Sequence, residues 1–356
     1  MQSSGASVPM TAQTLTEFDT VIDARTPSEF AEDHIPGAVS APVLDDAERA
    51  KVGTLYKQVS PFEAKKVGAA LVAANVARHI EANFSSYPKT WRPLVYCWRG
   101  GKRSGAMAHI LREIGWQAVT LEGGYRAYRR HVVEQLAKVP ARLEFLVVHG
   151  PTGSGKSRLL AALRSAGAQV IDLEQLAAHR GSVLGTLPGR PQPTQKLFES
   201  RLLASLQELD ASRPVFVEGE SKKIGQIHVP EALIERMRAC ECVRLETSLD
   251  TRVRLLLDEY RHFVADRAAL EAQLDCLVAL HGRERIAEWK RLAALGDWPE
   301  FVRRLLLEHY DPAYGRSSLR NFARLPQARV VRIASVAAFD RAASELAGAA
   351  ASRAAA

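Results

Sequence analysis

Short apolar runs alternate with amphipathic stretches along the first third of the chain, which is the pattern of strands separated by helices. We expect strands at residues 20–23, 93–97 and 117–121, each rich in Val, Ile or Leu. Residues 61–81 place apolar side chains at helical spacing, and residues 107–114 do the same after the second strand. Because strands that alternate with helices favour a parallel sheet, this region predicts a first α/β domain.

A second α/β pattern follows. Strands are expected at residues 143–148, 169–173, 214–218 and 242–246, with a helix at residues 156–165. After the last of these strands the sequence becomes mostly helical and basic. The expected fold class is therefore α/β, with two parallel-sheet domains and a mostly helical C-terminal part in the second.

The chain length of 356 residues supports two domains at roughly 150 residues per domain. We expect the first domain at residues 1–135, a linker at 136–142, the second domain at 143–340 and an Ala-rich tail at 341–356.

Composition narrows the class of protein. Hydrophobic residues make up 47% and charged residues 25%, which excludes a disordered or collagen-like chain. No apolar run approaches the ~18 residues of a membrane span, and neither a secretory signal nor a cysteine framework is visible. These features predict a reduced, cytoplasmic protein without a membrane partner. The net charge of +8 attracts polyanions and phosphorylated small molecules without selecting among them.

Cys97 lies where an apolar strand ends and a helix begins. Backbone N–H groups of such a loop bind anions, and nearby cations favour the reactive thiolate, so Cys97 is the candidate nucleophile. A buried, inert cysteine is the alternative. Trp98 is either a stacking platform for a base or a packing residue. The residues expected to form the anion-binding loop are Trp98, Arg99, Gly100, Gly101, Lys102 and Arg103.

Residues 150–157 match the phosphate-binding loop pattern G-x-x-x-x-G-K-[ST] completely, after a strand and before a helix. Lys156 would neutralise terminal phosphates, and the Ser157 hydroxyl is the candidate Mg²⁺ ligand. The pattern indicates a diphosphate-containing ligand and does not establish that the ligand is a nucleotide. The expected diphosphate-binding residues are Gly150, Thr152, Gly153, Ser154, Gly155, Lys156 and Ser157.

Several charged residues are candidates for supporting roles. Glu218 ends a strand where an acidic side chain would face a metal ion. Arg252 and Arg254 contact phosphate or else begin a solvated basic helix. Asp172 faces the metal side or braces a loop.

Residues 16–130 resemble a rhodanese domain. The resemblance depends on Val21–Arg25, Glu29-Phe30, His34–Ala38, the Cys97 loop and Leu121–Gly124, which occur in the family's order. It implies that sulfur or selenium is carried on Cys97. It also implies that Asp23 and Arg25 brace the loop, while His34 packs in a turn.

The loop departs from the usual rhodanese spacing in one respect. Arg103 and Ser104 follow Cys97 at six and seven residues instead of the usual five and six. This longer loop also matches the Cys-x5-Arg pattern of cysteine phosphatases. A phosphate-bearing donor or a phosphatase is favoured over an ordinary small sulfurtransferase.

A rhodanese-like domain directly upstream of a P-loop domain is similar to the tRNA 2-selenouridine synthase family. Residues 96–101, 150–157 and 309–312 support this resemblance. It implies that tRNA wobble 2-thiouridine is S-geranylated from geranyl diphosphate, after which selenium from selenophosphate replaces the geranylthio group. No tightly bound prosthetic group is expected, although Mg²⁺ is a candidate cofactor. Three alternatives stay open: an ATP-dependent kinase with a rhodanese module, a sulfurtransferase- or phosphatase-like enzyme, and a nucleotide-switched RNA-binding protein. The sequence leaves the oligomeric state undetermined.

Overall fold

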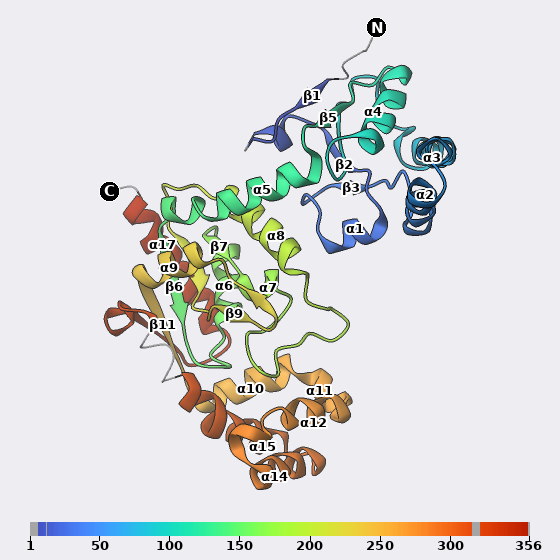
Figure 1. Cartoon of the computed structure of the whole chain (residues 1–356). Helices are drawn as coiled ribbons and strands as arrows, with labels where there is room; N and C mark the ends of the chain where they lie inside the picture. Colours follow the sequence, from blue (N-terminus) through green and yellow to red (C-terminus); the bar gives the residue numbers. More distant parts are fainter. Residues whose placement is uncertain (1–5, 12, 315–320, 355–356) are drawn as a thin grey trace. The chain divides into compact units, whose positions relative to one another are not determined.

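The computed structural model describes residues 6–11, 13–314 and 321–354. The chain divides into two compact units, each with a five-stranded parallel sheet (Figure 1). The first unit consists of Met1–Gln135 and Thr194–Ala204, and the second of Leu136–Pro193 and Ser205–Ala356. The expected α/β fold class is therefore confirmed.

The sheet of the first unit has the strand order β1-β5-β4-β2-β3, and every neighbouring pair is parallel. The expected strands appear as β2, β4 and β5, the last being shorter than predicted. The strands are β1 (Ser7–Val8), β2 (Thr20–Asp23), β3 (Val39–Ser40), β4 (Pro93–Tyr96) and β5 (Val119–Leu121).

Five α-helices accompany this sheet. They are α1 (Pro27–Glu32), α2 (Asp46–Gln58), α3 (Pro61–His79), α4 (Lys102–Ile114) and α5 (Gly124–Leu136). Helix α1 begins at Pro27 because Thr26 and Glu29 form a capping box, in which each side chain accepts the other residue's backbone N–H. Helix α2 was not predicted, since it buries none of its residues and shows no apolar face.

The core of the first unit lies between the sheet and these helices. Ile22 and Val95 from the central strands pack with Met107 and Leu111 from α4. Trp91 is also buried, and its indole N–H donates to the Thr20 hydroxyl at 2.9 Å. This packing holds the carboxyl end of β4, where Cys97 follows, in a fixed position.

The sheet of the second unit has the strand order β12-β11-β6-β8-β7, again entirely parallel. Strand β12 was not predicted, because only Ile333 of this edge strand is buried and arginines interrupt its apolar pattern. The strands are β6 (Phe145–His149), β7 (Gln169–Ile171), β8 (Val215–Glu218), β11 (Glu241–Thr247) and β12 (Arg329–Ile333).

The remaining helices form two groups. Those next to the sheet are α6 (Lys156–Ser165), α7 (Leu173–Leu176), α9 (Glu231–Ala239) and α17 (Ala338–Ala354), whereas α8 (Gln195–Gln207) is divided between the two units. A second group gathers at one end of the unit around buried Trp289, Phe301 and Leu306 (Figure 1). It contains α10 (Leu249–Glu259), α11 (Arg261–Ala265), α12 (Arg267–Asp275), α13 (Val278–His281), α14 (Arg283–Ala294) and α15 (Trp298–Leu305). It confirms the expected helical part.

Residues 341–354 of the expected Ala-rich tail are helical, because they belong to α17. Helix α17 packs on α6 and buries Phe339, Ala343 and Leu346 in the core of the second unit. Alanine is a strong helix former, and its small side chain lets two helices approach closely. The segment through Ala354 is therefore a structural helix.

The expected continuous domain at residues 143–340 is interrupted. Residues 195–204 of α8 belong to the first unit, where Arg129 pairs with Glu199, and Lys196 pairs with Glu32 at 2.6 Å. Part of the expected linker is also ordered, since Val139–Arg142 forms a 3₁₀ helix that packs against α9. Within the described ranges, none of the helices has the length and apolar content that crossing a bilayer requires.

Candidate functional sites: a cysteine loop and a P-loop

Cys97 directly follows β4 and is 4% exposed. The Ser104 hydroxyl, in the first turn of α4, donates to Cys97 Sγ at 3.2 Å. Burial raises the pKa of the thiol, but hydrogen bonds from the Ser104 hydroxyl and from the backbone N–H groups of Ser104, Gly101 and Arg99 outweigh it. The net result is a lowered pKa, as expected for a nucleophilic cysteine in an anion-binding loop.

Two glycines allow this loop to close against the turn after β5. A Cβ on Gly100 would lie 2.4 Å from the Leu121 carbonyl oxygen, and one on Gly124 would lie 2.1 Å from the Cys97 carbonyl oxygen. Both glycines also have positive φ, at 67° and 56°. A side chain at either position would push the loop away from the turn.

Asp23 and Arg25 contribute to a chain of contacts that reaches the Cys97 loop, and the rhodanese resemblance implies this bracing role. Both side chains are buried and paired at 2.6 Å. The Arg25 guanidinium lies 4.0 Å from the ring centre of Tyr125, whose hydroxyl donates to Asp33 at 2.7 Å. The Tyr125 backbone N–H donates to the Cys97 carbonyl at 2.8 Å. This chain of contacts ties the nucleophile to the core.

The three expected cations of the loop have different environments. Arg103 makes a two-point salt bridge with Glu29, with N–O distances of 2.6 and 3.2 Å. We expected Arg103 to be a free cation of the anion-binding loop. It is not, because the Glu29 carboxylate in α1 already neutralises its charge. Arg99 and Lys102 are exposed, and no described acidic group lies within ion-pair distance of either. His34 stacks on Phe30, in agreement with its predicted packing role.

The P-loop follows β6 and ends at Ser157, the second residue of α6. A Cβ on Gly153 would lie 2.8 Å from Leu256, and one on Gly155 would lie 2.2 Å from Phe339. Gly150 is equally crowded, since its Cβ would lie 2.4 Å from the Ser154 hydroxyl. The loop keeps its backbone N–H groups available for phosphate only with glycine at these positions.

Carboxylates surround the P-loop lysine. Lys156 Nζ donates to the Gly150 carbonyl at 3.1 Å. Burial lowers its pKa, but the charges of Glu174, Glu220 and Glu218 outweigh that effect and raise it. Burial and the Glu174 carboxylate in turn raise the pKa of Glu220 to about 8. The lysine therefore remains charged, while burial and neighbouring carboxylates raise the pKa of both Glu218 and Glu220.

A magnesium ion fits this site only together with phosphate oxygens. Glu218 Oε1 accepts the Glu174 backbone N–H at 2.7 Å, whereas Oε2 is buried and has no partner among the described residues. Ser157 donates to Glu174 at 3.1 Å. The described part of the chain contains no cluster of three or more His, Cys, Asp or Glu arranged to hold a metal ion. Mg²⁺ commonly takes one or two protein ligands and completes its shell with phosphates and water.

Arg252 braces the P-loop instead of contacting phosphate. It is 5% exposed, donates to the Thr152 carbonyl at 2.7 and 3.0 Å, and pairs with Asp311 at 2.6 Å. Arg254 is exposed on the solvated side of α10. Asp172 caps α7 by accepting the Gln175 backbone N–H at 2.7 Å, which selects its loop-bracing role.

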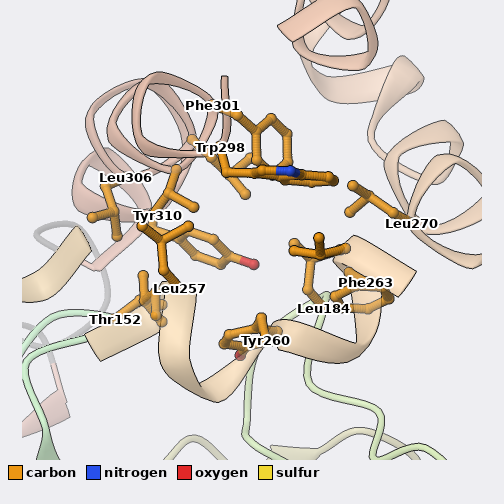
Figure 2. Close-up of a pocket in the computed structure, with 14 residues that line it drawn as sticks. Thr152, Leu184, Leu257, Tyr260, Phe263, Leu270, Trp298, Phe301, Leu306 and Tyr310 are labelled. Carbon is orange, nitrogen blue, oxygen red and sulfur yellow. The ribbon is translucent and has the colours of Figure 1, made fainter. Parts of the chain in front are cut away.

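Two neighbouring cavities lie at the P-loop. The first, of about 720 Å³, is lined by the P-loop, by acidic residues and by Arg180, whose Nη1 has no partner among the described residues. The second is apolar and is enclosed by α10, α11, α12, α15 and Leu184 (Figure 2). Figure 2 shows Trp298 and Phe301 on one side of it and Thr152 and Tyr260 on the opposite side. Thr152, Leu256, Tyr260 and Tyr310 line both cavities.

Several of these residues were missed from the sequence. Ser104 was noted only for its spacing, and Asp311 only as part of a motif. Glu174 and Glu220 each lie two residues from an acidic residue that was considered, so charge clustering after the strands was the available signal. The residues that line the apolar cavity could not be recognised from the sequence, because apolar side chains at helical spacing resemble those of an ordinary hydrophobic core.

An anion-binding cysteine loop and a P-loop with an adjoining apolar cavity define a chain with a rhodanese-like domain fused to a P-loop domain. Residues 10–131 match the rhodanese-like domain, and residues 143–282 match the tRNA 2-selenouridine synthase AAA domain. The chain belongs to the tRNA 2-selenouridine synthase family.

Three of the similar proteins illustrate this relationship, and each carries the name tRNA 2-selenouridine synthase. Identity to the Sulfurovum sp. (strain NBC37-1) protein is 34% over 336 residues, covering 86% of this chain and 90% of that one. Identity to the Shewanella denitrificans protein is 36% over 330 residues, covering 83% and 87%. The Nitrosomonas europaea protein is 37% identical over 244 residues, which cover 67% of this chain and 63% of that one, slightly under two thirds of its length. By their name these relatives are tRNA-modifying enzymes.

The hydrogen bond from Ser104 predicts a pH effect on Cys97. A thiol with a lowered pKa loses its proton at lower pH than an ordinary cysteine. In Ser104→Ala, the pH at which the alkylation rate of Cys97 by a small reagent rises should therefore be higher by roughly one pH unit. Mass spectrometry of the Cys97 peptide measures the rate, with Ser85→Ala as the control for an exposed serine. An unshifted profile would show that Ser104 does not stabilise the thiolate.

The bracing pair predicts a local loss of stability. Asp311→Asn keeps the shape of the side chain but removes its charge, leaving buried Arg252 without its ionic partner. Because Asp311 is partly exposed, with 31% accessibility, we expect a loss of only about 1.5 kcal/mol. Hydrogen exchange of P-loop peptides measures it, and Arg254→Ala should change protection by less than about 0.5 kcal/mol. Equal effects of the two variants would contradict the bracing role.

Proposed function

We propose that the protein converts 2-thiouridine at the wobble position of tRNA into 2-selenouridine in two steps. The second unit transfers a geranyl group from geranyl diphosphate to the uridine sulfur. The loop of Cys97 then exchanges the geranylthio group for selenium from selenophosphate. The names of the relatives support the overall reaction, and the geometry of each site supports the step assigned to it.

The observation that favours geranyl diphosphate is the apolar cavity that adjoins the P-loop. Four residues line both this cavity and the one over the P-loop. A prenyl diphosphate presents charge to one side and hydrocarbon to the other, which matches this pair of cavities. A nucleoside triphosphate would instead direct a polar ribose away from its phosphates. The cavity therefore favours the geranyl donor over the ATP of a kinase.

The cavity is narrow before a ligand enters. Its volume is about 40 Å³, well below the ~150 Å³ of an apolar cavity that accepts benzene. The geranyl chain must therefore displace wall side chains such as Trp298 and Phe301. Aromatic faces of Tyr310 and Trp298 suit the positive charge that develops on an allylic carbon as diphosphate departs.

In the first step, a bond forms between the uridine sulfur and the terminal carbon of geranyl, and the carbon–oxygen bond to diphosphate breaks. Lys156 and the P-loop N–H groups stabilise the charge that develops on the leaving diphosphate. Arg180 has a buried, unpartnered N–H available for the same charge. Ser157 and Glu218 would hold a Mg²⁺ ion that arrives with the diphosphate, and such an ion neutralises part of that charge.

In the second step, alkylation has made the sulfur a good leaving group. Forming Cys–S–Se⁻ from a thiolate and selenophosphate removes two electrons and so needs an oxidant. A route without one begins with attack of the Cys97 thiolate on C2 of the uridine, which expels geranylthiolate, and the latter takes a proton from water. The selenium of selenophosphate then attacks C2 and expels Cys97, and hydrolysis of the Se–P bond releases phosphate. We assign this balanced route to the Cys97 loop.

The phosphatase alternative is disfavoured by the position of Arg103. A cysteine phosphatase uses the arginine of its Cys-x5-Arg loop to bind the phosphate, but here that guanidinium is held by both carboxylate oxygens of Glu29. The loop retains its backbone N–H groups as anion donors.

The two-step assignment predicts complementary losses in two variants. Lys156→Ala should slow geranylation by about 10²- to 10³-fold, because the departing diphosphate loses its main side-chain partner. Cys97→Ala should geranylate tRNA normally and make no selenouridine, so geranylated tRNA accumulates. Mass spectrometry of tRNA nucleosides, after incubation with both donors, measures each product.

Matched variants separate these effects from general damage. Arg254→Ala and Cys276→Ala remove an exposed cation and an exposed cysteine, and both should retain full activity. If Cys97→Ala produced a normal yield of 2-selenouridine, Cys97 would have no part in the reaction. Undiminished geranylation by Lys156→Ala would mean that the P-loop has another ligand. In the balanced route, Cys97 of the wild-type protein also forms an adduct with geranylated tRNA when selenophosphate is omitted.

A further inference from the structure

A hollow of about 390 Å³ lies in the first unit beside the Cys97 loop. Trp98 forms one side of it, and arginines of α5 form another. The reaction assigned to Cys97 does not use these side chains. The hollow nevertheless adjoins the nucleophile, since Trp98 is the next residue in the chain.

The hollow is rigidly connected to the nucleophile. The Trp98 ring stacks on Tyr125 with ring centres 5.3 Å apart. The backbone N–H of Arg126 donates to the Trp98 carbonyl at 3.2 Å, one residue after the bond between Tyr125 and Cys97. Trp98 is therefore held by the same two backbone hydrogen bonds that position the catalytic loop, and its ring is only partly buried.

The charges around the hollow fall into two classes. Arg129 and Lys196 are paired with Glu199 and Glu32. Arg126 and Arg130 are exposed, and neither has an ion pair or hydrogen bond with any described side chain. They lie four residues apart on α5, so their side chains project from the same face of the helix. Glu134 also lines the hollow and forms no ion pair with either arginine among the described residues. Two arginines without ion pairs and one carboxylate thus line a hollow whose other side is an aromatic ring.

A flat aromatic surface next to free cations is suited to single-stranded nucleic acid. Bases of RNA loops are splayed out and stack on aromatic rings, while arginines bind the connecting phosphates. A small inorganic anion such as selenophosphate would make no use of an indole ring, and the backbone N–H groups at Cys97 already provide for it. The combination therefore favours RNA over the selenium donor.

We propose that this hollow binds the anticodon-loop strand next to the modified uridine. A neighbouring base stacks on Trp98, and its phosphate lies between Arg126 and Arg130. The inference rests on the proposed function, since it presumes a tRNA substrate. It adds the residues that hold the RNA while its uridine is at Cys97.

The test compares the full-length Arg126→Ala/Arg130→Ala variant with Lys65→Ala/Arg78→Ala. The control removes two exposed, unpaired cations from α3 of the same unit. The affinity for geranylated tRNA is measured at several salt concentrations, together with the KM values for tRNA and selenophosphate. Circular dichroism and thermal unfolding establish that both variants are folded.

The α5 variant should bind tRNA more weakly, and the slope of log affinity against log salt should fall by about 0.7, the value for one lost phosphate contact on a single strand. Its KM for tRNA should rise about tenfold or more while its KM for selenophosphate stays unchanged. Trp98→Ala should also raise the KM for tRNA, and Trp98→Phe should restore most of it. The α3 control should behave as the wild type.

Three outcomes would overturn the inference: an unchanged salt slope and KM for tRNA, a rise only in the KM for selenophosphate, or equal losses in the α3 control. The proposed function fails in a different way, because then the wild-type protein itself produces no selenouridine. The two failures are therefore distinguishable within one set of assays.

Discussion

Both sites depend on one arrangement of the main chain, a glycine-containing turn that directs backbone N–H groups toward one point at the carboxyl end of a buried parallel strand. At Cys97 these groups stabilise a thiolate, and in the P-loop they are available to phosphate. In each turn, neighbouring atoms lie so close to a glycine that a Cβ could not be added without moving the loop. The rest of each unit, from the strand core to the bracing arginine, serves to hold that turn in place.

In each unit a buried arginine braces the anion-binding turn. Arg25 in the first unit and Arg252 in the second are almost completely buried, and each is paired with an aspartate. Each also reaches structure that adjoins the anion site, through Tyr125 or through the Thr152 carbonyl. An arginine used in this way cannot also contact a ligand. The charges available to substrates are therefore the cations without partners, such as Arg126 and Arg130.

The sequence predicted the fold class, most of the central strands and both catalytic turns, because these depend on local patterns: apolar strands, glycine spacing and a lysine or cysteine at a fixed position. It did not predict strand β12, whose arginines hide an edge strand, or that the Ala-rich helix α17 packs into the core. It also misjudged Arg103 and could not choose a role for Arg252. The partners of these arginines, Glu29 and Asp311, lie far away in the sequence and become neighbours only through folding. The apolar cavity was likewise invisible, since its walls come from several helices and look like core in the sequence.

The central claim is that the second unit recognises a diphosphate joined to a hydrocarbon chain. Calorimetry of the full-length protein with geranyl diphosphate, inorganic diphosphate and ATP, each with Mg²⁺, tests it most directly. Burial of apolar carbon contributes ~0.8 kcal/mol per methylene, so burying four methylene equivalents should make geranyl diphosphate bind roughly 200-fold more tightly than diphosphate. Binding should also have the negative heat-capacity change that is characteristic of apolar burial, and Trp298→Ala should alter this heat-capacity change. Equal affinities for geranyl diphosphate and inorganic diphosphate, or tighter binding of ATP than of either, would contradict the account.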